Sequence, residues 1–209
     1  MKWFGPMPEP PMGSPGIVLT AMRWWVEAQA LPPPIRQFRR RAITLALRSR
    51  DLMAIRYTVP TGQLRILLDL TERRRQIVEI GTGWGWTAAA LVLAHPDCAV
   101  ETYDPVVPPL RSAYLDLLPE EARERIELVQ ARGQDATLPD RPVDALFVDD
   151  AHQTAEIVAT VSRWLPALAT DAVVVFDDFS ESYYPGVRVA IEELGLSGYP
   201  HGRFFVAEI

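Results

Sequence analysis

Acidic side chains and one histidine follow two apolar runs of this 209-residue chain. Asp149 and His152 follow the first run, and Asp177 and Asp178 end the second. If the two runs are neighbouring parallel strands, about 4.8 Å apart, the carboxylates converge and repel one another unless a cation or protons intervene. The acids offer only oxygen ligands, which suits Mg²⁺, Mn²⁺ or Ca²⁺ rather than zinc, with Mg²⁺ as the first choice. The alternative is a set of solvated or turn-capping acids.

His152 stands three residues after Asp149 at the start of an expected helix, so both side chains can face one pocket. An imidazole with its ordinary pKa near 6.5 is suited to taking a proton at neutral pH. We therefore predict that His152 is a general base, with Asp149 beside it in the catalytic site. The alternative is an ordinary surface histidine.

A glycine-rich turn joins an apolar strand to a helix start in QIVEIGTGWGWTAAAL, residues 76–91. Gly81, Gly83 and Gly85 allow a tight turn and a close approach to a ligand, because they carry no Cβ. Strand, glycine turn and helix form the first unit of a nucleotide-type pocket. A dinucleotide site would have its third glycine where Trp86 stands, so the pattern disfavours NAD without excluding it. A tight turn without a ligand is the remaining alternative.

Asp104 ends the next apolar run and lies twenty-three residues after Gly81. This separation is near the ~20-residue offset of the carboxylate that binds ribose hydroxyls in nucleotide sites. Every adenosine cofactor has this ribose, so Asp104 supports a nucleotide-type pocket without choosing among cofactors. The alternative is a plain loop acid.

The motif VEIGTGWGWTA resembles the first motif of the class I S-adenosylmethionine (SAM) methyltransferases, in which an acid such as Glu79 precedes the glycines. The resemblance implies a SAM site built at the strand ends, with Gln134 and Asp135 placed to touch the adenine. The residues that it implies for cofactor binding are Glu79, Gly81, Thr82, Gly83, Gly85, Trp86, Thr87, Asp104, Gln134, Asp135 and Asp149.

The stretch VDALFVDDAHQTAEIVATVSRWLPALATDAVVVFDDFSESYYPGV resembles the metal-dependent O-methyltransferases. It is similar to the catechol and caffeoyl-CoA enzymes and closer to the macrocin O-methyltransferase-like group, over about residues 62–187. The resemblance implies a base three residues after the first metal ligand, which is His152 here and lysine in catechol-type members. The metal ligands that it implies are Asp149, Asp177 and Asp178.

The chain departs from that family at two places. Asp150-Ala151 stands where the family often has glycine between two acids, and Thr170-Asp171 replaces a glycine pair before the strand. Neither change removes a residue with an implied role.

The elements that must position these residues alternate between strand and helix after residue 61, which indicates a parallel α/β sheet. The expected strands are 77–80, 99–103, 126–129, 143–148, 172–176 and 203–209, with a sixth in chain order near 195–199. Together with the resemblance, this pattern predicts a single Rossmann-like class I methyltransferase domain. Its sheet is seven-stranded and mostly parallel, with helices on both faces, and an N-terminal helical extension precedes it.

Three regions are expected along the chain. Residues 1–16 are rich in Pro, Gly and Met and predict an irregular leader. Residues 17–60 predict a helical arm or lid, and residues 61–209 the SAM-binding domain.

The arm is expected to form helices at 17–30 and 35–50. The first should place Val18, Met22 and Trp25 on one face, with Ala21 and Trp24 beside it. The second has apolar residues at helical spacing and many arginines, which predicts a solvated basic face. The alternative is that the arm serves as a lid or joins two copies in a homodimer.

Composition excludes several kinds of protein. Cys98 is the only cysteine, so an internal disulfide and a cysteine-rich zinc site are excluded. Lys2 is the only lysine, which excludes P-loop and Schiff-base lysines from the body of the chain. Neither a secretory signal nor an apolar run of about 18 residues is seen, so we expect a cytoplasmic protein without a membrane contact.

Charge is distributed unevenly along the chain. Residues 1–50 hold eight lysines and arginines against two acids, whereas residues 51–209 hold thirteen against twenty-five. An acidic body with a basic arm is not typical of a nucleic-acid binder. We expect the arm to lie on the acidic body or on a partner subunit.

These features predict a SAM-dependent, divalent-metal-dependent O-methyltransferase. Its acceptor would be a small hydroxylated molecule with adjacent oxygens, of natural-product or sugar type. Two alternatives are an NAD-dependent oxidoreductase of Rossmann type and a SAM-binding interaction protein without catalysis.

Overall fold

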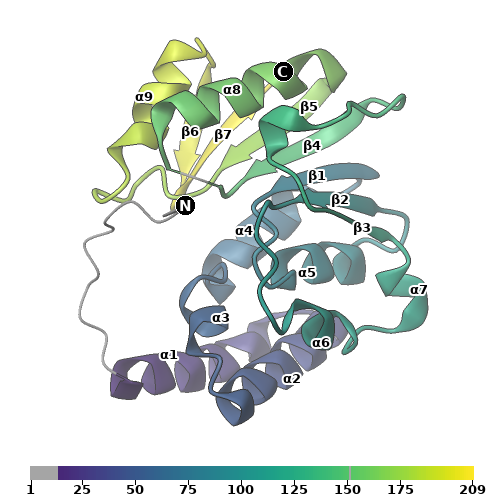
Figure 1. Cartoon of the computed structure of the whole chain (residues 1–209), viewed down its shortest axis with the longest axis vertical. Coiled ribbons are helices and arrows are strands. Elements are labelled where there is room, and N and C mark those ends of the chain that lie inside the picture. The colour runs from purple at the N-terminus through teal and green to yellow at the C-terminus, as the bar shows by residue number, and fades with distance from the viewer. Residues whose placement is uncertain (1–13, 151) are drawn as a thin grey trace.

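A seven-stranded sheet forms the centre of the computed structural model, which describes residues 14–150 and 152–209 (Figure 1). Its strand order is β3-β2-β1-β4-β5-β7-β6. β7 runs antiparallel to β5 and β6, and the other pairs are parallel. The strands are β1 (Gln76–Ile80), β2 (Ala99–Tyr103), β3 (Ile126–Val129), β4 (Val143–Val148), β5 (Leu168–Phe176), β6 (Gly198–His201) and β7 (Phe204–Glu208).

This topology confirms the predicted class I methyltransferase fold. The strand expected near 195–199 is β6, which runs from Gly198 to His201. The helix expected from residue 17 begins earlier, because α1 starts at Ser14, while residues 1–13 of the expected leader lie outside the described residues.

The central strands read as continuous apolar runs because helices cover both faces of the sheet. α4 (Thr61–Leu70), α5 (Trp86–Ala94), α6 (Arg111–Leu115) and α7 (Glu120–Arg123) lie on one side, and α8 (Thr154–Trp164) and α9 (Pro185–Glu193) on the other (Figure 1). Two hydrophobic cores result, one on each face. Short 3₁₀ turns complete the chain at η1 (Ala28–Ala30), η2 (Gly133–Asp135) and η3 (Leu165–Ala167). None of the helices in the described residues has the length and apolar character needed to cross a membrane.

The strand register brings the strand ends to one level. Ile80 pairs with Val148, and Val148 pairs with Phe176, so β1, β4 and β5 end side by side. The next residue of each chain segment therefore emerges at the same edge of the sheet, where ligands of open α/β sheets bind. We call this edge the carboxyl rim.

The N-terminal helices form an outer layer beneath α5 (Figure 1). They are α1 (Ser14–Glu27), α2 (Pro33–Ser49) and α3 (Leu52–Arg56). α2 packs on α5, and its apolar residues join the core of that face of the sheet. The arm thus contributes to the core. Its role as a lid or as a contact in a homodimer stays a prediction.

The predicted apolar face of α1 is wrong for Val18, Met22 and Trp25, because the buried side is the one that holds Ala21 and Trp24, which were expected beside it. Ile17, Ala21 and Trp24 are buried at helical spacing, whereas Met22 is 59% exposed and Trp25 is 43% exposed. The helix carries apolar residues on most of its circumference, so periodicity alone could not choose the buried side. The Trp25 ring instead lies beneath the Arg40 guanidinium, 4.0 Å from its centroid.

The expected solvated basic face of α2 is also wrong at one position. Arg39 is fully buried, with its guanidinium between the rings of Trp24 and Trp86. It donates hydrogen bonds to the Thr58 hydroxyl and to the Val59 carbonyl. Burial lowers the pKa of Arg39 to about 10. The guanidinium therefore ties the arm to the segment that enters α4.

Candidate active site

Gly81 brings the ends of β1 and β4 into close contact at the carboxyl rim. The Asp149 N–H donates to the Ile80 carbonyl at 2.8 Å, and Gly81 follows with a φ of +104°. A Cβ at this position would lie 1.9 Å from the Asp149 carbonyl oxygen. Glycine is therefore required here for packing of the two loops as well as for turn conformation.

The glycine turn is fixed to the end of β2. The Gly83 N–H donates to Asp104 Oδ2 at 2.8 Å, and Arg111 donates to the Gly83 carbonyl at 2.7 Å. Arg111 also lies 3.3 Å from the Asp104 carboxylate. A Cβ on Gly83 would meet no atom within 4 Å, so the turn is open at that point. Asp104 thus lies at the turn, while its predicted contact with a ribose stays a prediction.

Glu79 is buried beneath the glycine turn. It accepts a hydrogen bond from the Thr102 hydroxyl at 2.5 Å, and that hydroxyl lies 2.8 Å from the hydroxyl of Thr82. Burial, which disfavours the charged form, raises the pKa of Glu79 to about 8, and the nearby Asp104 adds to the rise. The carboxyl is therefore largely protonated at neutral pH.

Replacing Glu79 by glutamine is expected to flatten the dependence of stability on pH. The pKa of Glu79 is raised from 4.5 to about 8 on folding, so the folded state keeps a proton that the unfolded state loses across this range. Stability consequently falls as pH rises from about 4.5 to about 8. Thermal melting at pH 5, 6.5 and 8 should show a smaller fall in Tm for Glu79→Gln than for the wild type.

The control for this experiment is Glu127→Gln, since Glu127 is an exposed glutamate in β3. Its Tm should follow the wild-type slope with pH. Equal slopes for Glu79→Gln and the wild type would contradict a protonated Glu79.

The remaining residues implied for cofactor binding occupy different surroundings. Trp86 is 2% exposed and packs in the core, with its ring 5.2 Å from that of Tyr114. Thr87 is buried in the first turn of α5. Gln134 and Asp135 lie in η2, where Asp135 is exposed. Packing in the core is enough to explain a tryptophan at position 86. The cofactor contacts of these four residues stay predictions.

Trp84, by contrast, connects the glycine turn to the arm. Its indole N–H donates to Asp51 Oδ2 at 2.8 Å, and the Tyr114 hydroxyl donates to the same oxygen at 2.9 Å. Asp51 also accepts from the Ala54 N–H at the start of α3. This junction was missed in the sequence, because its members are far apart along the chain.

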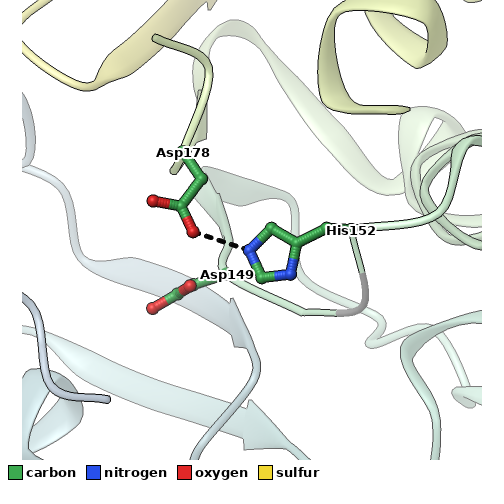
Figure 2. A group of neighbouring side chains, drawn as sticks. All are labelled: Asp149, His152 and Asp178. Atoms are coloured by element: carbon green, nitrogen blue, oxygen red, sulfur yellow. Dashed lines mark hydrogen bonds and ion pairs between the residues drawn. The ribbon is translucent and has the colours of Figure 1, made fainter. Parts of the chain in front are cut away.

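Three of the predicted catalytic and metal-binding side chains converge at the rim (Figure 2). Asp149, His152 and Asp178 each offer one ligand atom, and these atoms all lie within 4.8 Å of one another. His152 Nε2 lies 2.7 Å from Asp178 Oδ2. The Tyr184 ring stacks on the imidazole, with the centroids 3.8 Å apart. Asp178 and Tyr184 therefore fix the orientation of His152.

Asp177 lies beside this cluster rather than in it. Its Oδ1 accepts the N–H of Asp178 at 2.7 Å, and Asp178 adopts a left-handed φ of +59°. Together with Asp149 and His152 it lines a small cavity of about 10 Å³, roughly the space that one water molecule needs. Its part in metal binding stays a prediction.

The acids of the rim share an unfavourable electrostatic environment. Burial raises the pKa of Asp149 well above its usual range, and the neighbouring Asp177 raises it further. Burial likewise raises the pKa of Asp177 to about 6, although Arg203 opposes the rise. The pKa of His152 is lowered, chiefly by burial, so its imidazole is neutral at pH 7.

Arg203 is a member of this site that sequence reasoning missed. It lies in the turn between β6 and β7, and its Nη2 forms an ion pair with Asp178 Oδ1. Its Nε lies 3.6 Å from Asp177 and 3.5 Å from Glu181. An arginine before the last strand carries no local motif, so only the antiparallel return of β7 beside β5 reveals its position.

Residues 78–179 match the model of a family described as a methyltransferase domain. The match covers 102 of the 209 residues and includes the glycine turn and the three aspartates of the rim. The predicted methyltransferase is thereby confirmed in both family and strand order. No curated protein matches the sequence.

Solved structures share this fold over nearly the whole chain. The O-methyltransferase TomG from Streptomyces achromogenes, involved in tomaymycin synthesis and solved with SAM, is 22% identical, with a TM-score of 0.64 over 90% of this chain and 98% of that one. An O-methyltransferase from Bacillus cereus solved with SAH is 17% identical, with a TM-score of 0.62 over 92% and 99%. CalS11, a TDP-rhamnose 3′-O-methyltransferase of calicheamicin biosynthesis, is 16% identical, with a TM-score of 0.60 over 94% and 95%.

Proposed function

We propose that this methyltransferase transfers a methyl group from SAM to a hydroxyl of a small molecule with adjacent oxygens, with the help of a divalent cation. The observation that carries the proposal is the meeting of Asp149, His152 and Asp178 at the rim beside the glycine turn. The O-methyltransferases of similar fold, two of them solved with SAM or SAH, support both the donor and the oxygen acceptor. The acceptor is of natural-product or sugar type.

The glycine turn fits SAM as the donor. Gly83 leaves open space where any other residue would place a Cβ, and Asp104 lies beside it at the end of β2. A carboxylate in this place can accept from ribose hydroxyls. Glu79 is buried below, where a ligand ammonium would favour its charged form.

The acids of the rim fit a hard divalent cation. Asp149, Asp177 and Asp178 offer carboxylate oxygens, the ligands that Mg²⁺ prefers in proteins. The raised pKa of Asp149 and that of Asp177 both report repulsion and burial that a cation would relieve. We assign these three aspartates as its ligands.

When bound, SAM supplies a sulfonium methyl group, and a divalent cation lowers the pKa of an acceptor hydroxyl. His152 takes the hydroxyl proton. Its Nε2–H donates to Asp178 Oδ2, which leaves Nδ1 as the basic atom. Tyr184 stacks on the ring and keeps Nδ1 in place. The loops after β1 and β4 pack closely on each other, which fixes the position of His152 relative to the glycine turn.

Calorimetric titration with SAM and, separately, with NAD tests the donor. SAM should bind and NAD should not, whereas the reverse result would favour an oxidoreductase. Incubation with SAM and a panel of catechols, flavonoids and sugars then tests for catalysis through the release of S-adenosylhomocysteine. SAM binding with no methyl consumed on any acceptor would favour a SAM-binding interaction protein.

Removing divalent metal with EDTA is expected to lower the rate of methyl transfer roughly tenfold or more, because the cation activates the acceptor. Added Mg²⁺ should restore the rate, and the affinity for SAM should stay the same throughout. Asp177→Asn should show little response to Mg²⁺. An EDTA-treated enzyme with the full rate would contradict the metal assignment and leave methyl transfer itself in place.

A further inference from the structure

Both carboxylate oxygens of Asp178 already have partners. Oδ2 lies 2.7 Å from His152 Nε2, and Oδ1 forms an ion pair with Arg203 Nη2. Asp178 is 5% exposed, so water has little access to it. An oxygen engaged by a guanidinium cannot donate its lone pair fully to a metal ion at the same time. A cation that uses Asp178 as a ligand therefore has to displace a partner.

Arg203 is held in this place by ion pairs with the surrounding carboxylates and by one hydrogen bond, which its Nη2 donates to Asp178 Oδ1. Its Nε lies 3.6 Å from Asp177 Oδ1 and 3.5 Å from Glu181 Oε1, distances at the edge of or beyond hydrogen bonding. The same Nε is buried and has no hydrogen-bond partner. A guanidinium that leaves a buried donor unsatisfied gains its stabilisation from the surrounding carboxylates.

The backbone of Arg203 is fixed while its side chain can move. The Arg203 N–H donates to Gln63 Oε1 at 3.2 Å, and its carbonyl accepts from the Ser180 N–H at 3.4 Å. The side chain is 30% exposed, so a path to solvent is open. Movement of the side chain alone would then free Asp178 Oδ1 and take the positive charge away from Asp177.

We propose that Arg203 is the internal counter-charge of the acidic rim, that it occupies the place of the divalent cation in the metal-free protein, and that it must leave before the cation binds. This inference rests on the metal site of the proposed function. Arg203 acts here as a positioning residue that sets metal affinity. Without metal, its positive charge stabilises the buried carboxylates of Asp177 and Asp178. With metal present, it competes with the cation for the same oxygens.

The test is the binding of Mn²⁺ alone, measured by electron paramagnetic resonance on the full chain. Arg203→Met removes the competing charge and should bind Mn²⁺ at least tenfold more tightly than the wild type. Arg203→Gln, which keeps hydrogen-bonding capacity, should shift in the same direction. The matched control is Arg188→Met, because Arg188 lies on α9, where it donates to the carbonyl of Phe179 and lies over the Phe179 ring. Its Mn²⁺ affinity should match the wild type.

Unchanged or weaker Mn²⁺ binding by both Arg203 variants would overturn the inference. Thermal melting with and without Mn²⁺ covers the case in which the variants fold poorly. Rescue of their Tm by Mn²⁺ supports the inference, since the metal then replaces the guanidinium, and failure of rescue overturns it. Methyl transfer by the wild type is measured separately, so a failed inference about Arg203 is distinguishable from a failed proposal of methyl transfer.

Discussion

Replacing His152 by alanine is expected to lower the rate of methyl transfer roughly 10²–10⁴-fold, the usual contribution of a positioned general base. The imidazole is neutral at pH 7 because burial lowers its pKa, so it is ready to accept a proton. Asp178 and Tyr184 fix its orientation, which alanine cannot reproduce. The measurement is single-turnover methyl transfer from SAM at pH 7, with saturating acceptor.

His201→Ala is the matched control, because His201 is an exposed histidine in β6. Its rate should equal that of the wild type. The affinity for SAM should be unchanged in both variants, since His152 belongs to the acceptor side of the rim in the proposed mechanism. A normal rate for His152→Ala at pH 7 would remove His152 as the base.

The parts of the fold that could be predicted from the sequence are those set by local pattern. β2, β3 and β4 have the expected bounds, because each is a short apolar run between polar turns. β5 is longer than expected, since it begins at Leu168 and includes polar residues that the apolar pattern left out. The first residues of β5 pair with β4 through an irregular register, which the local sequence does not indicate.

The convergence of Asp149, His152 and Asp178 could be predicted because it follows from topology. Parallel strands in register end at one level, so residues that follow them meet at one rim. Arg203 could not be predicted in this way, since it reaches the rim from the turn before the antiparallel strand β7. The buried face of α1 was equally beyond the sequence, because apolar residues occupy several of its faces and the choice depends on contacts with α3 and α4.

A methyl group added at position 81 is expected to destabilise the protein strongly. The Cβ of Gly81→Ala would lie 1.9 Å from the Asp149 carbonyl oxygen, a backbone atom that cannot move without shifting β4. The φ of +104° is in addition a conformation that residues with a Cβ rarely adopt. Strain and displaced packing together should cost about 3 kcal/mol or more. Thermal unfolding should show a Tm lower by roughly 6–12 °C for a chain of this size.

Substitutions at two other glycines distinguish the steric clash from the backbone strain as causes of this destabilisation. Gly83→Ala meets no atom within 4 Å but keeps a left-handed φ of +49°, so only the strain of about 1–2 kcal/mol should appear. Gly62→Ala, in the first turn of α4, has neither clash nor positive φ and should raise stability by up to about 1 kcal/mol. If Gly81→Ala were no less stable than Gly83→Ala, the loops after β1 and β4 would not touch. The glycine turn and the acids of the rim would then lack the contact that joins donor and acceptor sites into one active site.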